Sequence, residues 1–314
     1  MICTLCQKSE ANKKNTHYLT DGIIRNCLNL DGHNGRERGF YFDLSNSKTF
    51  VEFNFQRATS IEKLESSLGR PITDEEIEKA KATPYSVDYV FCTECEDIFT
   101  AIEDRFISEI LPKFRSANLS DIEKVEITDL KVSRLFFYLQ IWRTSICSSL
   151  FRIPEAIKED IRQMILHFDK IEENNLTGYP IAVTYLETLG EEAEYTTNFV
   201  GLTDDENPYI IIMNDFVIQF YESKESIIFL EFFGLNSESN FKEFINLHEK
   251  KFIVRVIDNS ARKKFLYNFA KNLADQKIES YNRGFTEAWT KCVGSAPSSK
   301  IKEEYLKAIT GGNE

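Results

Sequence analysis

The segments CTLC at residues 3–6 and CTEC at residues 92–95 decide the fold of the N-terminal part of this 314-residue chain. Each segment presents two thiols at the spacing of a zinc knuckle, and two knuckles supply the four sulfur ligands of one tetrahedral Zn²⁺. Their polar surroundings argue against pairs that are merely small buried side chains. We expect a structural Zn²⁺, because four thiolates leave no coordination position open for catalysis. The expected metal ligands are Cys3, Cys6, Cys92 and Cys95.

The remaining thiols and the hydropathy indicate where the protein works. Cys27, Cys147 and Cys292 stand alone and are expected to be core thiols. Seven cysteines in a long chain are too few and too unevenly placed for a disulfide scaffold. No run reaches the roughly eighteen apolar residues of a membrane span, and the first cysteines stand where a signal peptide would have its charged and apolar regions. We expect a cytoplasmic protein with no membrane segment.

Outward from the cysteines, the chain is expected to be an α+β protein of three regions. Residues 1–115 are expected to form a zinc-binding module with a helical insertion near 59–83, and residues 116–175 a helical region. Residues 176–314 are expected to form a β-rich domain with an antiparallel sheet and a long C-terminal helix. Alternating apolar residues at 41–55 predict a strand pair. A short strand at 88–92 and a helix at 96–114 are expected around the second knuckle.

Composition changes from helix-like to strand-like after residue 175. Apolar helical patterns occupy 127–150 and 154–168, and the second helix opens at a proline. Four runs rich in β-branched and aromatic residues then predict four antiparallel strands, at 181–189, 195–202, 209–221 and 226–235. A helix near 240–248, a strand at 252–258 and a helix from 260 to about 293 are expected to follow, with loosely held residues at 295–300 and 309–314.

Charge limits the surfaces that can meet nucleic acid. The net charge of −12 argues against a polyanion-binding surface over the whole protein. Residues 1–57 hold eight Lys and Arg against six Asp and Glu, which leaves −14 for the remainder, so we expect this segment alone to tolerate phosphate. Ordinary solvated side chains are the alternative. The candidate nucleic-acid contacts are Lys13, Lys14, Arg25 and Arg36, with Lys8 and Arg38 nearby.

The order of motifs resembles that of the zinc-stapled ββα endonucleases of the HNH type. The motifs are CTLC, THYLTDGII from Thr16, VFCTECE from Val90 and IWRTSI from Ile141, and the resemblance covers about residues 1–150. It is closest to bacterial HNH-like proteins, and some of that wider class lie beside ATPases in anti-phage defence loci. The resemblance implies a ββα module, catalytic Mg²⁺ or Mn²⁺, nucleic acid, either DNA or RNA, as substrate, and a protein partner such as an ATPase subunit or a second copy.

The resemblance also assigns candidate roles within the site. His17 falls where the first His of the family pattern would, and it is the expected general base. The candidate catalytic partners are His33, Asn34 and Glu96, with Asp21, Asn26 and Glu103 as further metal or orienting groups. The chain departs from the family at Thr16, where Asp or Glu is usual, and at Glu96, where His or Asn is usual.

An alternative function follows from these departures and from the second half of the chain. It is a non-catalytic zinc-binding adaptor or sensor that recruits a partner protein or DNA, with the acidic β-rich half as its docking surface.

The role of Arg143, which lies in an apolar helical run, is a separate question. Its guanidinium can bind a phosphate, but we expect it to pair with an acidic neighbour while its stem lies along the core.

Overall fold

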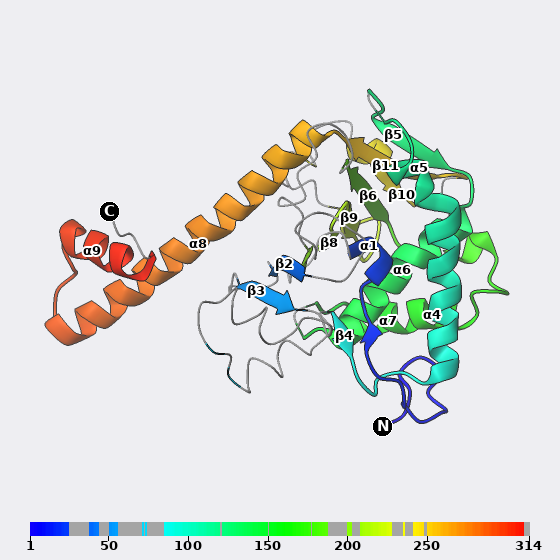
Figure 1. The fold of residues 1–314 in the computed structure, drawn as a ribbon, viewed down its shortest axis with the longest axis horizontal. Helices are drawn as coiled ribbons and strands as arrows, with labels where there is room; N and C mark the ends of the chain where they lie inside the picture. Colours follow the sequence, from blue (N-terminus) through cyan, green and yellow to red (C-terminus); the bar gives the residue numbers. More distant parts are fainter. Residues whose placement is uncertain are drawn as a thin grey trace.

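The computed structural model shows an α+β protein in which helices pack against a mixed sheet, so the expected fold class is confirmed (Figure 1). It describes residues 1–24, 38–43, 50–55, 71, 73, 85–119, 121–149, 151–176, 178–187, 200–202, 208–227, 235, 241–247 and 250–310. Several expectations lie outside these residues. They concern Arg25, Asn26, Cys27, His33, Asn34, Arg36, most of the insertion near 59–83 and most of the strand at 226–235.

The N-terminal part is built from a two-stranded ribbon and a helix. Strands β1 (Thr16–His17) and β4 (Ser86–Val87) pair antiparallel, with Thr16 opposite Val87. Helix α1 (Asp21–Ile24) follows β1, and α4 (Thr93–Arg105) begins directly after Cys92. The strand expected at 88–92 is wrong, because Tyr89 has a φ of 60° and its N–H donates to the carbonyl of Lys13 at 2.7 Å. The chain therefore turns before it enters the helix.

The helix expected at 96–114 is present but changes its winding. Helix α4 passes into a π-helical turn, η2 (Phe106–Ile110), and then into α5 (Pro112–Arg115). Pro112 has no N–H to give to the preceding turn, which accounts for the change of winding near it. The ring of Phe106 stacks on Phe136 with centroids 3.7 Å apart. The π-helical turn thus brings an aromatic side chain into the centre of the core.

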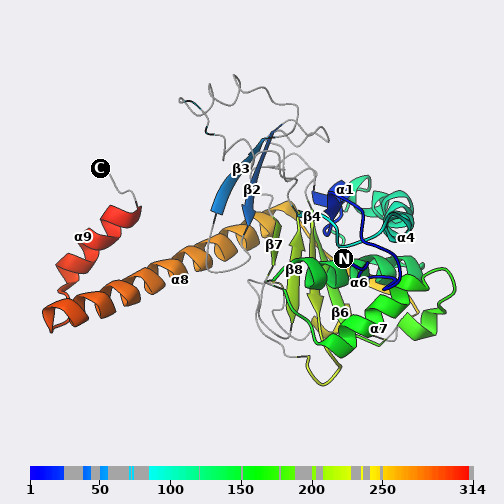
Figure 2. The same ribbon diagram turned by 90° about the horizontal axis from the view of Figure 1, so that it is seen from below.

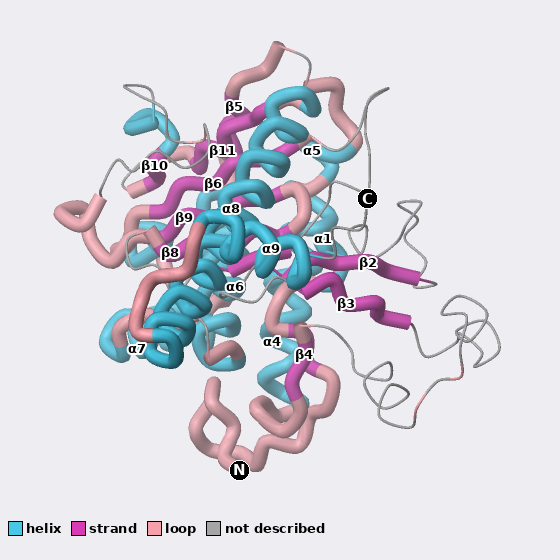
Figure 3. The backbone as a smooth tube through the Cα atoms, turned by 90° about the vertical axis from the view of Figure 1, so that its left-hand side faces the viewer, coloured by secondary structure: helices cyan, strands magenta, loops and turns pink. Residues whose placement is uncertain are grey.

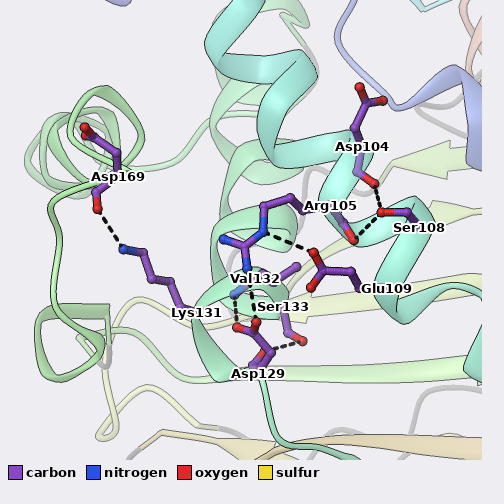
Figure 4. A network of polar contacts seen from close by, with 9 residues as sticks. All are labelled: Asp104, Arg105, Ser108, Glu109, Asp129, Lys131, Val132, Ser133 and Asp169. Carbon is purple, nitrogen blue, oxygen red and sulfur yellow. Dashed lines mark hydrogen bonds and ion pairs between the residues drawn. The ribbon is translucent and has the colours of Figure 1, made fainter.

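Two further helices complete the helical layer. Helix α6 (Leu130–Cys147) is buried over most of its length, α7 (Glu155–Leu166) starts after Pro154, and the 3-10 helix η3 (Glu173–Leu176) follows. Helix α6 starts later than expected, because Asp129 accepts a hydrogen bond from the N–H of Val132 at 2.9 Å and so caps it. Figure 4 shows that Arg105 reaches the same carboxylate, which joins the end of α4 to the start of α6.

Among the described residues the main sheet has nine strands. Its order is β3-β2-β7-β8-β9-β6-β11-β5, and β10 pairs with β6. The strands are β2 (Arg38–Asp43), β3 (Phe50–Phe55), β5 (Lys124–Ile127), β6 (Ile181–Leu186), β7 (Val200–Leu202), β8 (Tyr209–Met213), β9 (Phe216–Phe220), β10 (Ile245–Asn246) and β11 (Phe252–Ile257). The expected strand pair at 41–55 is confirmed as β2 and β3.

The sheet is mixed and not wholly antiparallel as expected. Strand β11 runs parallel to β6, and β2 is parallel to β7. The run 209–221, expected as one strand, is the hairpin β8–β9, whose turn residue Asn214 has a φ of 57°. The helix expected near 240–248 is wrong, since Asn246 pairs with Ile181 in β10 after the short 3-10 helix η5 (Phe241–Phe244).

The sheet is covered on both faces (Figure 2). Helix α6 lies on one face, where Phe137 packs on Phe216 and Phe252. The start of α8 (Asn259–Val293) covers the other face with Phe265 and Phe269. No helix among the described residues is both long and apolar enough to cross a membrane.

The C-terminal end is ordered as a helical hairpin. Helix α8 ends at Gly294, which has a φ of 80°, and α9 (Ser299–Thr310) folds back along it. The rings of Phe285 and Tyr305 stack with centroids 4.1 Å apart. The ranges expected to be loosely held, 295–300 and 309–314, therefore include the first and last residues of α9.

Candidate metal centre

The structure brings the four predicted cysteine ligands together. The sulfur atoms of Cys3, Cys6, Cys92 and Cys95 all lie within 4.8 Å of one another, and all four cysteines are free. The distance between the sulfurs of Cys6 and Cys92 is 3.9 Å. A tetrahedron with Zn–S bonds of about 2.3 Å has edges of about 3.8 Å. The cluster can therefore hold a metal ion such as zinc.

Backbone hydrogen bonds shape both knuckles and join them. In the first, the N–H of Gln7 donates to the carbonyl of Cys3 at 2.9 Å, and Gln7 has a φ of 56°. The N–H of Thr4 donates to the carbonyl of Val90 at 3.1 Å, which fixes the first knuckle against the approach to the second. Cys92 precedes α4, so the second knuckle starts a helix as expected from the sequence.

The electrostatics of the bare cluster are those of a site that needs a cation. Burial raises the pKa of the Cys92 thiol to about 11 and raises that of Cys95 further. Burial also opposes ionisation of Cys6, but the N–H groups of Ser9 and Lys8 outweigh it and lower the pKa of Cys6 to about 6. Four adjacent thiolates are stable only beside a positive charge, which a bound metal ion supplies.

An arginine from the helical layer anchors the first knuckle. The guanidinium of Arg162 on α7 donates to the carbonyl of Leu5, which is fully buried. The same guanidinium forms a two-bond pair with the carboxylate of Glu159, with distances of 2.7 Å. The hydrogen bond from Arg162 to Leu5 spans 157 positions, so no local pattern in the sequence predicts it. The metal cluster is consequently attached to the body of the protein.

His17 lies in β1, one strand of the two-stranded ribbon. Its Nε2 is 3.8 Å from the carboxylate of Asp21, and the two side chains are 21% and 14% exposed. The neighbouring Thr16 donates its hydroxyl to Oε2 of Glu96 at 3.0 Å. The ribbon and the start of α4 therefore bring Glu96 next to the strand that carries His17.

Glu96 is a half-buried carboxylate in a mixed electrostatic environment. Burial raises its pKa, while the hydrogen bond from Thr16 and the charges of Arg143 and Lys13 oppose that rise. Only Oε2 of Glu96 is hydrogen-bonded to the part of the chain that the structure describes. The other oxygen is left to bind a cation or a donor.

Glu103 of α4, which is half-buried, forms an ion pair with the buried Arg143 of α6. The guanidinium of Arg143, which is 1% exposed, donates to Glu103 and lies over the ring of Phe99 at 5.3 Å. Thr20 joins the pair, since its hydroxyl donates to Glu103 at 2.7 Å and its N–H to Gln140 at 3.0 Å. The expectation that Arg143 pairs with an acidic neighbour is thus confirmed, and the carboxylate of Glu103 already accepts hydrogen bonds from Arg143 and Thr20. The roles of Thr20 and Gln140 were not evident from the sequence.

The other predicted contacts are placed only in part. Lys14 is exposed and its Nζ lies 5.2 Å from the centre of the Tyr89 ring, and Lys13 is half-buried. Arg25, Arg36, His33 and Asn34 lie outside the described residues. Two of the three lone cysteines lie among the described residues. Cys147 packs against the core as expected, and burial raises its pKa to about 12, but Cys292 is exposed, so the core assignment is wrong for Cys292.

Within the described residues, the four cysteines are the only group of three or more His, Cys, Asp and Glu side chains close enough to share a metal ion. His17 and Asp21 form a pair, and Glu96 lies across the ribbon, but they make no second cluster of this kind. Comparison of the chain with protein-family models, with curated proteins and with solved structures finds no match. The arguments about function therefore start from the geometry of the site.

Proposed function

We propose that the chain is a zinc-stabilised, HNH-like endonuclease that hydrolyses phosphodiester bonds with the help of a divalent cation. One observation carries the proposal: the hydrogen bond between Thr16 and Glu96 joins the strand of His17 to the helix of the second knuckle across 80 positions. Glu96, the candidate cation ligand, therefore lies beside Thr16, the neighbour of the candidate base His17 in the chain. The resemblance of residues 1–150 to HNH-like proteins supports the same assignment.

The proposed structural ion is Zn²⁺, held by Cys3, Cys6, Cys92 and Cys95. Four sulfur ligands at the observed spacing suit zinc, and this set leaves no position for water or substrate. Its role would be to fix the start of the chain against α4. His17 is not among the four ligands of this ion, and an imidazole changes its charge near neutral pH, as proton transfer requires.

His17 would act as the general base. Asp21, 3.8 Å from the imidazole, stabilises the imidazolium that forms when the ring takes a proton from water. The resulting hydroxide would attack the phosphorus, the bond from phosphorus to the leaving oxygen would break, and that oxygen would take up a proton from solvent water. Glu96 would hold Mg²⁺ or Mn²⁺ through its oxygen that makes no hydrogen bond to the described chain. When bound, such a cation stabilises the negative charge that develops on the phosphate.

One carboxylate is sufficient for such a cation. Mg²⁺ keeps several waters and is commonly held by one or two carboxylates together with phosphate oxygens of the substrate. The lack of a second cluster of protein ligands in the described residues is therefore compatible with the proposal. Lys13 and Lys14, next to the ribbon, would contact the nucleic-acid backbone. By resemblance, the protein would be the effector of a bacterial anti-phage defence complex in the cytoplasm, with an ATPase subunit as partner.

Plasmid cleavage tests the proposal. The full chain is incubated with supercoiled DNA, and separately with RNA, in Mg²⁺ or Mn²⁺, beside His17→Ala and Glu96→Gln. Glu94→Gln is the matched control, because Glu94 lies in the same helical turn but is exposed. We expect cleavage by the wild type and by Glu94→Gln, and loss of at least about a hundredfold in the other two variants. Equal cleavage by His17→Ala would rule out the assigned base.

A non-catalytic zinc adaptor is the second candidate. The net charge of −12 favours it, because a strongly acidic surface suits docking of a basic protein better than gripping of DNA. The same experiment separates the two candidates. Absence of cleavage with either metal, alone or with a partner ATPase, together with binding of a protein partner, would leave the adaptor as the function.

A further inference from the structure

The distal part of the C-terminal hairpin, residues 275–310, projects beyond the body of the protein. Figures 1 and 2 show α8 leaving the sheet and α9 folding back on its far end. In Figure 3 the same two helices lie in front of the sheet. The aromatic seam between them, formed by Phe285, Trp289 and Tyr305, is only half-buried.

The charge of this hairpin differs from that of the rest of the chain. Residues 275–310 hold six Lys and Arg against five Asp and Glu, a net charge of +1 in a chain of −12. The whole of 259–310 carries ten Lys and Arg against five Asp and Glu, so the expectation that only residues 1–57 escape the acidic balance is wrong. The signs are interspersed in the hairpin, which does not suit a polyanion. Two acidic molecules can approach each other here without mutual repulsion.

Four exposed charges on α8 alternate in sign at intervals of one helical turn. They are Glu279, Arg283, Glu287 and Lys291, and we refer to them as the charge stripe. No ion pair within the described residues engages any of them. Each residue turns an α-helix by about 100°, so Arg283 and Glu287, two positions on either side of Phe285, point about 160° away from its ring. The charge stripe is therefore on the side of α8 that α9 leaves uncovered.

The charge stripe is complementary to a second copy of itself. If two α8 helices cross antiparallel about a two-fold axis near residue 285, Glu279 meets the partner's Lys291, and Arg283 meets the partner's Glu287. The symmetry repeats both pairs, so all four contacts join opposite charges. A parallel pairing would place like charges opposite each other. The sequence of signs therefore selects one partner, another copy of this chain, and one orientation.

Gly284 allows the two helices to approach closely at this crossing. A Cβ atom built on Gly284 would meet nothing within 4 Å, so packing within the chain does not require glycine there. Glycine inside a helix costs about 1 kcal/mol relative to alanine, and a neighbouring backbone is one reason to keep it. The aromatic seam lies on the opposite side of α8 from this crossing, so the seam of each copy stays against its own α9.

We propose that the protein forms a two-fold dimer through α8, in which the charge stripes of two copies pair antiparallel across Gly284. In the dimer the two paired α8 helices would connect the two copies, with the metal centre of one copy at each end. This inference rests on the hairpin alone and does not depend on the nuclease proposal.

Sedimentation velocity on the full chain, with and without charge reversal, tests the dimer. The variant Glu279→Lys/Glu287→Lys makes the charge stripe wholly basic, and Arg283→Glu/Lys291→Glu makes it wholly acidic. We expect the wild type to be a dimer, each variant alone to associate at least about tenfold more weakly, and an equimolar mixture of the two variants to form a dimer again. Recovery in the mixture shows that neither variant is merely unfolded.

Two matched variants complete the test. Glu172→Lys/Glu173→Lys changes the net charge as much as the first variant at exposed positions far from α8, and it should remain dimeric. Gly284→Leu adds a side chain where the chain itself has open space, so the fold should be retained, as seen by circular dichroism, while the dimer is lost. A monomeric wild type at all concentrations, or dimers that survive reversal of the charge stripe, would overturn the proposal.

Discussion

Replacing Arg115 by methionine should be among the most destabilising single changes at the junction between the N-terminal part and the sheet. Arg115 on α5 donates to both carboxylate oxygens of Asp215, at 2.6 and 2.9 Å, in the turn between β8 and β9. It also donates to the carbonyls of Gly22 and Ile23 in α1, at 3.1 and 2.8 Å. One guanidinium thus joins three elements that are distant in sequence.

The cost follows from the burial of the partner. The side chain of Asp215 has no exposure, whereas that of Arg115 is 15% exposed. Removing one member of a buried pair costs about 3–5 kcal/mol, because the other charge is left without a partner, and the partial exposure of Arg115 favours the lower end, about 3 kcal/mol. Arg115→Lys keeps the charge but cannot make the two-bond contact, so we expect a loss of about 1–2 kcal/mol.

Urea unfolding followed by far-UV circular dichroism measures these losses, and a double-mutant cycle isolates the pair. Arg115→Met/Asp215→Asn removes the buried charge together with its partner, so it should be less destabilised than the sum of the single variants by about 1–3 kcal/mol. Hydrogen exchange of the amides of α1 should also rise in Arg115→Met. A loss below about 1 kcal/mol for Arg115→Met, or additive single changes, would refute the reasoning.

Further predictions concern the metal centre and the helical layer. Cys95→Ser should abolish stoichiometric metal binding and expose the N-terminal segment to trypsin, whereas Cys292→Ser, at an exposed position, should change neither; elemental analysis measures the metal, and proteolysis followed by mass spectrometry measures the exposure. After metal removal at about pH 7.5, iodoacetamide should modify Cys6 before Cys92, because the pKa is about 6 for the first and about 11 for the second, and equal rates would contradict the assignment. Asp129→Ala should lower the free energy of unfolding by about 1–2 kcal/mol, since α6 loses its N-cap, and an unchanged urea midpoint would show that the cap contributes nothing.

Local patterns in the sequence were sufficient for the parts of the fold that local physics determines. The apolar run of α6, the strand pair β2–β3 and the long helix α8 follow from periodicity and composition. The four cysteines were found because their spacing is dictated by the geometry of a tetrahedral metal site. These features need no knowledge of distant contacts.

Contacts between distant segments could not be read in the same way. The parallel pairing of β11 with β6 depends on where the chain returns after β10, which no local pattern specifies. The turn at Asn214 divides the run 209–221 where one residue adopts a positive φ, and the polar pair Asn214 and Asp215 was the local signal that could have shown it. The contact between Thr16 and Glu96 arises only when the two knuckles meet. The resemblance gave Glu96 a candidate role, but no pattern in the sequence indicates that Thr16 lies beside it.

Elemental analysis of the purified full chain tests the central claim most directly. We predict about one zinc ion per chain, lost together in Cys3, Cys6, Cys92 or Cys95 variants and retained when Cys147 is replaced by serine. A wild-type protein without stoichiometric metal, or a Cys92→Ser variant with an unchanged N-terminal fold, would contradict the account.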